Sequence, residues 1–215
     1  MIRLLIIADD FTGALDTGVK FSAAGASTKI ITDIHTDFTK EGPEVLVMCV
    51  PTRHLPPGEA YEAIRPVVER AAAAGVACIF KKTDSALRGN VGAELEAALD
   101  GSGRTELCFI PALPKMKRIT LGGIHYIDGV PVSQSVFGQD PFEPVTESYI
   151  PSLMAQQSSL PVRVVSRDAE GFRPTGERCV YLFDCAAQED LEHQLTVLEA
   201  QDLLHVLCLL YTSDA

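Results

Sequence analysis

The sequence is poor in basic residues, and this shortage restricts the partners that we expect. Lys and Arg total 18 against 29 Asp and Glu, which gives a formal net charge of -11 at pH 7. A general nucleic-acid surface or an anionic membrane surface needs an excess of basic residues to meet phosphate groups. We therefore expect no nucleic-acid partner and no membrane partner. An anionic ligand would need a local basic cluster.

Long apolar runs are also lacking. No apolar run approaches the length that spans a bilayer, and the amino-terminal residues do not place a basic segment before an apolar one, as secretion signals do. The apolar fraction of 47% nevertheless excludes wholesale disorder. The 215 residues suffice for one good core, or for one domain and part of a second. We expect a soluble, cytoplasmic protein.

The cysteines lack the spacings that mark metal or redox sites. There is no C-x-x-C pair and no Cys/His spacing typical of zinc, so we expect no protein-held metal. Most of the cysteines lie inside apolar, strand-like runs, and nothing indicates secretion, so we expect reduced core residues rather than disulfides. The six are Cys49, Cys78, Cys108, Cys179, Cys185 and Cys208.

Apolar strand-like segments alternate with helical segments along the chain, which predicts an α/β fold: a mostly parallel sheet with helices on both faces. An antiparallel hairpin excursion is expected at residues 119–133, because Asp128-Gly129 is a strong two-residue hairpin signal. We expect strands at residues 2–7, 27–32, 44–50, 76–80, 107–110, 162–165 and 179–183. We expect helices at residues 12–24, 57–74, 89–99, 146–157 and 189–200.

Two adjacent carboxylates, Asp9 and Asp10, follow the first buried strand. Thr12 is expected to cap the next helix, and Gly25 to end it. In open α/β sheets ligands bind outside the carboxyl ends of the strands, where free helix amino termini favour anions. The pair therefore predicts a functional site, although both carboxylates could instead cap or solvate the turn.

The same helix is expected to bury an apolar stripe against the sheet. Its members are Ala14, Leu15, Val19 and Phe21. They recur at the spacing of one helical face.

A second polar segment, residues 81–90, also follows an apolar strand. Arg88 offers a planar fork for a carboxylate or phosphate, and Gly89 lets the backbone come close to a ligand. The alternative is that Arg88 only pairs with Asp84 across the loop. Two strand ends with this complementary chemistry favour a polyhydroxy acid, whose hydroxyls bind Asp and whose carboxylate binds Arg or Lys.

Four motifs make the sequence similar to the four-carbon acid sugar kinases, which act on tetronates such as threonate, erythronate or 3-oxo-tetronate. The motifs are ADDFTGA at 8–14, KTDSALRGN at 82–90, GGIHYIDGVP at 122–131 and DPFEPVT at 140–146. They cover residues 1 to about 150 in the family's order. Of these, the Arg-Gly-Asn motif is fairly specific.

The resemblance implies an ATP-dependent transfer of a phosphoryl group to a substrate hydroxyl, with Mg²⁺ bound only through the nucleotide's phosphates. It implies that Asp10 orders the attacking hydroxyl or acts as its base. Arg88 and Asn90 would grip the substrate carboxylate and Asp84 a hydroxyl. A homodimer is also an expectation. The other substrate-binding candidates are Asp9, Thr12, Lys82, Ser85, Gly89, Gly123 and His125.

Gly123 and His125 have a separate expected role, because they lie at the predicted hairpin. There they could fold over the sugar acid as a lid. A lone histidine is as often structural, so a structural role for His125 stays open.

No recognisable ATP site occurs in the chain. It contains no G-x-x-x-x-G-K-[ST] loop, and residues 101–103 lack the third glycine and the setting of a dinucleotide turn. In the family the nucleotide site lies in a glycine-rich second domain. We therefore expect residues 1–207 to be a substrate-binding domain, truncated before the nucleotide-binding domain and inactive as a kinase by itself.

Residues 208–215 match one reading frame of a common transposon sequencing adapter, so we expect them to be an artefact. The alternative is a genuine final strand at residues 206–210, which are apolar enough.

Two other functions are alternatives to the kinase. A stand-alone sugar-acid binding or sensor module would use the same two sites without chemistry, and a true stop codon near residue 207 would support it. A phospho-acceptor receiver domain would need a further Asp after the third strand, where Val50, Pro51 and Thr52 stand instead. We discount the receiver.

Overall fold

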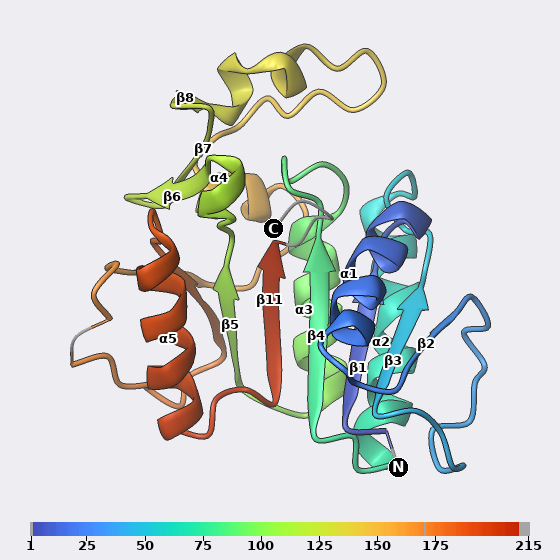
Figure 1. Cartoon of the computed structure of the whole chain (residues 1–215). Coiled ribbons are helices and arrows are strands. Elements are labelled where there is room, and N and C mark those ends of the chain that lie inside the picture. Colours follow the sequence, from blue (N-terminus) through green and yellow to red (C-terminus); the bar gives the residue numbers. More distant parts are fainter. Residues whose placement is uncertain (1, 170, 211–215) are drawn as a thin grey trace.

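A parallel sheet of eight strands forms the centre of the computed structural model, which describes residues 2–169 and 171–210 (Figure 1). The strand order is β2-β3-β1-β4-β11-β5-β10-β9, and every pairing is parallel. The predicted α/β class is confirmed. The strands are β1 (Leu4–Ala8), β2 (Thr28–Ile31), β3 (Val45–Cys49), β4 (Cys78–Thr83), β5 (Glu106–Ile110), β9 (Val162–Val165), β10 (Cys179–Phe183) and β11 (Val206–Leu210).

Helices cover both faces of this sheet (Figure 1). One face carries α1 (Phe11–Ala23) and α5 (Gln188–Ala200), and the other carries α2 (Pro57–Ala73) and α3 (Val91–Ser102). Because each central strand is covered on both sides, a strand such as β3 is apolar and buried at every position. The largest cluster of buried apolar side chains lies under α2 and α3.

A small antiparallel sheet stands above the carboxyl edge of the large one (Figure 1). It consists of β6 (Arg118–Leu121), β7 (Ile124–Ile127) and β8 (Val130–Pro131). The predicted hairpin is confirmed, because Asp128 and Gly129 connect β7 to β8 with φ values of 51° and 83°. Three short 3₁₀ helices flank this sheet, at Pro114–Met116, Val132–Gln134 and Val136–Gln139.

Helix α1 begins one residue earlier than the sequence predicts. Asp10 is its N-cap, and the Asp10 side chain accepts a hydrogen bond from the Gly13 N–H at 3.0 Å. The prediction that Thr12 caps the helix was wrong, because the preceding carboxylate already occupies that role. Gly25 follows the helix end with a φ of 91°, as predicted.

The predicted apolar stripe of α1 was wrong in part. Ala14 is buried, but Leu15 and Val19 are 40% and 62% exposed. The face turned to the sheet is built from small residues instead, and a Cβ on Gly18 would lie 2.9 Å from the Ile30 side chain. The helix therefore packs too close to the sheet for large side chains on that face.

The helix predicted at residues 146–157 is shorter in the structure, where α4 spans Ile150–Ala155. Pro151 lies in its first turn, the one helical turn that tolerates proline without loss of a hydrogen bond. Just before it, Tyr149 forms a bridge with Ile124 of the small sheet. Pairing with that sheet thus keeps the chain extended up to the start of the helix.

Residues 206–210 form β11, which lies between β4 and β5. The strand alternative for these residues is therefore observed. The adapter origin of residues 208–215 stays a prediction, and residues 211–215 lie outside the described residues. All six cysteines are free thiols, as predicted. Among the described residues, no helix combines the length and the apolar character that a membrane crossing requires.

Candidate functional site

The carboxyl ends of three neighbouring strands, β3, β1 and β4, carry the charged residues of the site. The loops that leave β1 and β4 lead to α1 and α3, which lie on opposite faces of the sheet (Figure 1). Such a switch point opens a crevice at the carboxyl edge of a parallel sheet. Charged side chains from residues 9–10, 53 and 82–88 meet there.

Arg53 is the centre of this charged cluster. Its Nε lies 2.7 Å from Asp9 Oδ2, one terminal nitrogen lies 3.1 Å from Asp10 Oδ2, and the other lies 3.6 Å from Asp84 Oδ1. The side chain is only 12% exposed. Burial would lower the Arg53 pKa, but the hydrogen bond to Asp9 and the three carboxylates outweigh burial and raise the pKa. Arg53 is thus a permanent cation among three anions.

Arg53 is absent from the residues that the sequence predicts. The position of Arg53 in the sequence could have indicated its role. A polar segment that includes Thr52 and Arg53 follows the buried strand β3, at the same edge of the sheet as the two predicted segments. It was missed because no carboxylate or glycine accompanies it in sequence.

Lys82 approaches the cluster from β4. Its Nζ lies 3.6 Å from Asp10 Oδ1, and its side chain is buried. A Cβ on Gly13 would lie 2.2 Å from this Nζ and 2.5 Å from Asp10 Oδ1. The glycine of the first motif therefore makes room for an ammonium group at the amino terminus of α1.

Asp84 and Arg88 form the ion pair that was the alternative prediction for them. Arg88 Nε and a terminal nitrogen each lie 2.9 Å from an Asp84 oxygen. Burial would raise the Asp84 pKa, but the Arg88 hydrogen bonds and the Arg53 charge lower it to about 2. Arg88 also lies 3.6 Å from Asp140 and over the Phe137 ring at 5.3 Å.

Asp9 is the most buried of the three cluster carboxylates. Burial would raise its pKa, but the charge of Lys81 and the Arg53 hydrogen bond lower it. In the described part of the chain, Asp9 Oδ1 and one terminal nitrogen of Arg53 are buried polar atoms without a hydrogen-bond partner. Such atoms are rare in native proteins. The Arg53 nitrogen is the one that lies 3.6 Å from Asp84 Oδ1.

A buried ion pair lies directly below the cluster. Lys81 Nζ is 2.8 Å from Glu94 Oε2 on α3, and neither side chain is exposed to solvent beyond a few per cent. Burial would lower the Lys81 pKa, but the Glu94 and Asp9 charges raise it. The Thr52 hydroxyl donates to the other Glu94 oxygen. This pair is part of the scaffold, because it has no access to a ligand.

The residues 89 and 90 lie against the Arg53 loop. Asn90 Nδ2 donates to the Thr52 carbonyl at 2.8 Å and to the Leu55 carbonyl at 2.7 Å. Gly89 has a φ of 84°, and a Cβ there would lie 3.1 Å from the Arg53 side chain and 3.3 Å from its backbone. A larger residue would displace Arg53.

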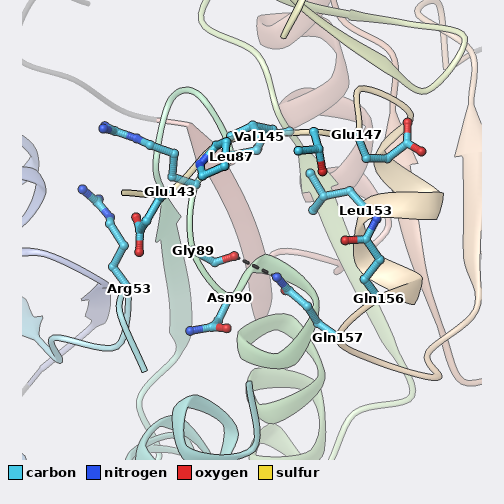
Figure 2. A pocket seen from close by; sticks show the side chains of 13 residues that line it. Arg53, Leu87, Gly89, Asn90, Glu143, Val145, Glu147, Leu153, Gln156 and Gln157 are labelled. Atoms are coloured by element: carbon cyan, nitrogen blue, oxygen red, sulfur yellow. Dashed lines mark hydrogen bonds between the residues drawn. The ribbon is translucent and has the colours of Figure 1, made fainter. Parts of the chain in front are cut away.

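A cavity of about 250 Å³ adjoins the cluster (Figure 2). It lies between the residue 87–90 loop on one side and residues 143–147 with α4 on the other, and Gln157 crosses its floor to donate to the Gly89 carbonyl at 2.8 Å. Arg53 and Arg88 belong to both the cavity wall and the cluster. Other polar side chains of the wall are Asn90, Glu143, Thr146, Glu147 and Gln156.

The hairpin residues predicted as a lid are engaged in contacts within the protein. His125 is buried, with Nε2 3.0 Å from the Ser85 carbonyl, and burial lowers its pKa to about 4. The N–H groups of Gly122 and Gly123 donate to the Asp184 carboxylate at 2.6 and 2.9 Å. Neither His125 nor Gly123 lines the cavity.

The structure thus divides the predicted residues into three groups. Asp9, Asp10, Lys82, Asp84 and Arg88 meet around Arg53. Gly89 and Asn90 join Arg88 at the cavity. The remaining four, Thr12, Ser85, Gly123 and His125, lie apart from both. Thr12 is exposed on α1, the Ser85 carbonyl contacts His125, and Gly123 lies in the turn between β6 and β7.

The acidic groups of the cluster do not form a metal site. In residues 2–169 and 171–210, no three His, Cys, Asp or Glu side chains are placed to hold a metal ion together. Instead, each of the three carboxylates faces an Arg or Lys cation. Alternating cations and carboxylates suit a ligand that carries both a carboxylate and hydroxyl groups.

A family model described as a sugar-binding N-terminal domain matches residues 4–213. The D-threonate kinase of Salmonella typhimurium is 36% identical over 165 residues, which are 75% of this chain and 38% of that protein. The D-erythronate kinase of Heliobacterium modesticaldum is 30% identical over 206 residues, which are 89% of this chain and 47% of that protein. The chain thus spans less than half the length of these relatives.

A solved structure has the same fold. It is a domain of unknown function from Bordetella bronchiseptica, crystallised with bound citrate as a domain-swapped dimer. The match has a TM-score of 0.83 and 27% sequence identity, and it covers 99% of this chain and 55% of the other.

Proposed function

The chain belongs to the family of sugar-binding N-terminal domains found in four-carbon acid sugar kinases, and on this basis we propose that it binds a tetronate at the carboxyl edge of its sheet. Threonate, erythronate and 3-oxo-tetronate are the candidate ligands. The observation that carries the proposal is the meeting of three carboxylates with the cations Arg53, Lys82 and Arg88, next to a cavity that shares Arg53 and Arg88.

The cations bind the ligand carboxylate in this proposal. Arg88 keeps one terminal nitrogen at 3.6 Å from Asp140, so a ligand carboxylate can displace that long contact. Lys82 holds its ammonium 3.6 Å from Asp10, a distance beyond a hydrogen bond. The citrate bound to the Bordetella bronchiseptica relative is another hydroxy acid anion, which supports an anionic ligand.

Asp10 receives the acceptor hydroxyl. Its side chain is 27% exposed, against 3% for Asp9 and 8% for Asp84, so it is the cluster carboxylate that a ligand reaches most easily. We propose that Asp10 orients this hydroxyl and removes the hydroxyl proton during phosphoryl transfer. Asp84 accepts from a second hydroxyl, while His125 supports the loop through Ser85.

ATP is the proposed phosphoryl donor, and residues 1–207 are the substrate-binding half of the enzyme. The described residues offer no fit for Mg²⁺, because every cluster carboxylate is paired with a cation. The nucleotide and its Mg²⁺ belong to the other half.

A homodimer and a cytoplasmic location complete the proposal. The domain-swapped dimer of the Bordetella bronchiseptica relative supports self-association. Light scattering coupled to size-exclusion chromatography measures the mass directly. A mass of 23.2 kDa at all concentrations would refute the dimer for this chain.

Calorimetric titration of the chain with D-threonate, D-erythronate and 3-oxo-tetronate tests ligand binding. Threitol, which has the hydroxyls but no carboxylate, and succinate, which has carboxylates but no hydroxyls, are the matched control ligands. We expect one tetronate to bind and both controls to fail. Equal binding of succinate would show a general anion site instead.

The kinase step is tested with the complete reading frame at the source locus, ATP and the same ligands. We expect phosphorylation of the tetronate that binds, and a loss of rate in Asp10→Asn with little change in ligand affinity. An unaltered rate in that variant would remove Asp10 as the base.

A further inference from the structure

The loop of residues 50–55, which carries Arg53, is held from below by the first turns of α3. Thr52 and Leu55 are bound by Asn90, and Thr52 is bound again by Glu94. The neighbouring His54 is largely exposed and pairs with Glu143. The loop is therefore fixed on both sides of Arg53, at residues 52 and 55.

The Asn90 amide has no donor left for a ligand. A side-chain amide carries two N–H donors. The Thr52 carbonyl takes one at 2.8 Å and the Leu55 carbonyl takes the other at 2.7 Å. The amide cannot be turned around, because its oxygen would then face two carbonyl oxygens. The amide oxygen remains free to bind a ligand, but it is a hydrogen-bond acceptor and so does not bind a carboxylate.

Thr52 connects the loop to the buried ion pair. Its hydroxyl donates to Glu94, whose other oxygen is held by Lys81 at 2.8 Å. Lys81 also donates to the Lys82 carbonyl at 2.7 Å, so the strand end that presents Lys82 and the loop that presents Arg53 share one buried network. Buried hydrogen-bond networks of this kind make the structure around them rigid.

We propose that Asn90 and Thr52 are positioning residues, which set the place of the Arg53 guanidinium among the three cluster carboxylates. This inference rests on the proposed function and assigns Asn90 a task other than gripping the carboxylate. Arginine is a long side chain, and its backbone needs fixing if its fork is to meet three partners at once. Displacement of such a group by about 1 Å costs up to about 100-fold in function.

A double-mutant cycle on tetronate affinity tests the proposal. Asn90→Ala removes both donors, and Arg53→Lys keeps the charge but removes the fork. We expect Asn90→Ala to weaken binding on the order of tenfold in the wild-type background and less than about twofold beside Arg53→Lys. Equal fold losses in both backgrounds would mean that Asn90 contacts the ligand, and would overturn the proposal.

Thr52 supplies a second, matched series. Thr52→Val removes the hydroxyl at constant shape, and we expect weaker binding that Thr52→Ser restores. Thr28→Val is the control, because Thr28 lies on β2, away from the site, and its hydroxyl donates to the Ala26 carbonyl just before that strand. A loss in Thr52→Ser as large as in Thr52→Val, or no loss in either, would overturn the role of the hydroxyl.

The Arg53 Nε–H resonance in nitrogen-15 NMR reports the position of the guanidinium without a ligand. We expect it to shift in Asn90→Ala and Thr52→Val and to stay in place in Thr28→Val. An unmoved resonance in both site variants would overturn the proposal, even if they bind less. Wild-type protein that binds no tetronate would instead refute the proposed function, and this resonance would still decide the positioning role.

Discussion

The charged cluster and the small antiparallel sheet lie at the same carboxyl edge and both contain polar motif residues, but their polar groups are used differently. In the hairpin, His125 bonds Ser85, and Asp184 bonds the amides of Gly122 and Gly123. In the cluster, Asp9 Oδ1 and one terminal nitrogen of Arg53 are buried without a hydrogen-bond partner among the described residues, as is Arg118 Nε on β6 of the small sheet.

This difference separates scaffold from site. A motif residue whose hydrogen bonds all end within the protein stabilises the fold, whereas Arg53 and Arg88 carry charged groups that line the cavity. We therefore propose that the hairpin shapes the edge and that the cluster binds the ligand. Each of the following changes alters one of the two regions, and the changes are expected to differ in their effects on stability and on binding.

Removal of the Arg53 charge is the most damaging change. Arg53→Met leaves Asp9, Asp10 and Asp84 without their shared cation, and we expect the free energy of unfolding to fall by about 3–5 kcal/mol. Tetronate binding should be lost as well. Urea unfolding and calorimetry measure both, with Arg65→Met on the exposed side of α2 as the control. Equal stability of the two variants would contradict the central role of Arg53.

The hairpin should respond to pH through His125. Its pKa is about 4 in the folded protein against an ordinary 6.5, so the unfolded chain binds its proton first as pH falls. Stability is therefore lost between about pH 6.5 and pH 4, by about 3 kcal/mol. His125→Phe should lack this part of the pH dependence of the free energy of unfolding. His193→Phe on α5 is the control, and identical profiles for wild type and His125→Phe would refute the assignment.

Asp184→Asn should loosen the hairpin without affecting binding. The amide would place an N–H group against one of the two backbone donors of residues 122 and 123. We expect a loss of about 2 kcal/mol in the free energy of unfolding. Tetronate affinity should change less than about twofold. The exposed Asp202→Asn serves as the control for loss of charge. A large loss of affinity would place the hairpin in the binding site.

Gly13→Ala should have the opposite effect to Asp184→Asn: it should weaken tetronate binding and leave the free energy of unfolding nearly constant. The new methyl group would lie 2.2 Å from Lys82 Nζ, so the ammonium must move. Alanine favours a helix over glycine by about 0.5–1 kcal/mol, which offsets the crowding. We expect affinity to fall about tenfold in calorimetry. Gly58→Ala on α2 is the control, because a Cβ there meets no atom within 4 Å.

The strands and the class of fold were predictable from the sequence because buried parallel strands are short, apolar and bounded by polar residues. β9 and β10 occur at the predicted residues, and the Asp128-Gly129 turn forms as expected. The failures have a common cause in tertiary contacts. The exposure of Val19 follows from close packing of α1, and the late start of α4 follows from pairing of Tyr149 with the small sheet.

Membership of the charged cluster was predictable where chemistry and position coincide in one motif, as for Asp9, Asp10 and Lys82. Arg53 was missed because its three acidic partners come from two other loops, which only the strand order brings together. Asn90 was found, but its hydrogen bonds to carbonyls 35 and 38 residues away carry no sequence signal.

A crystal structure of the chain with its preferred tetronate tests most directly whether the cluster is the ligand site. We expect the ligand in the cavity beside Arg53, with its carboxylate within hydrogen-bond distance of Arg88 or Lys82 and a hydroxyl on Asp10. A ligand bound at the hairpin, in contact with Gly123 or His125 and apart from Arg53, would contradict the division between binding cluster and supporting sheet.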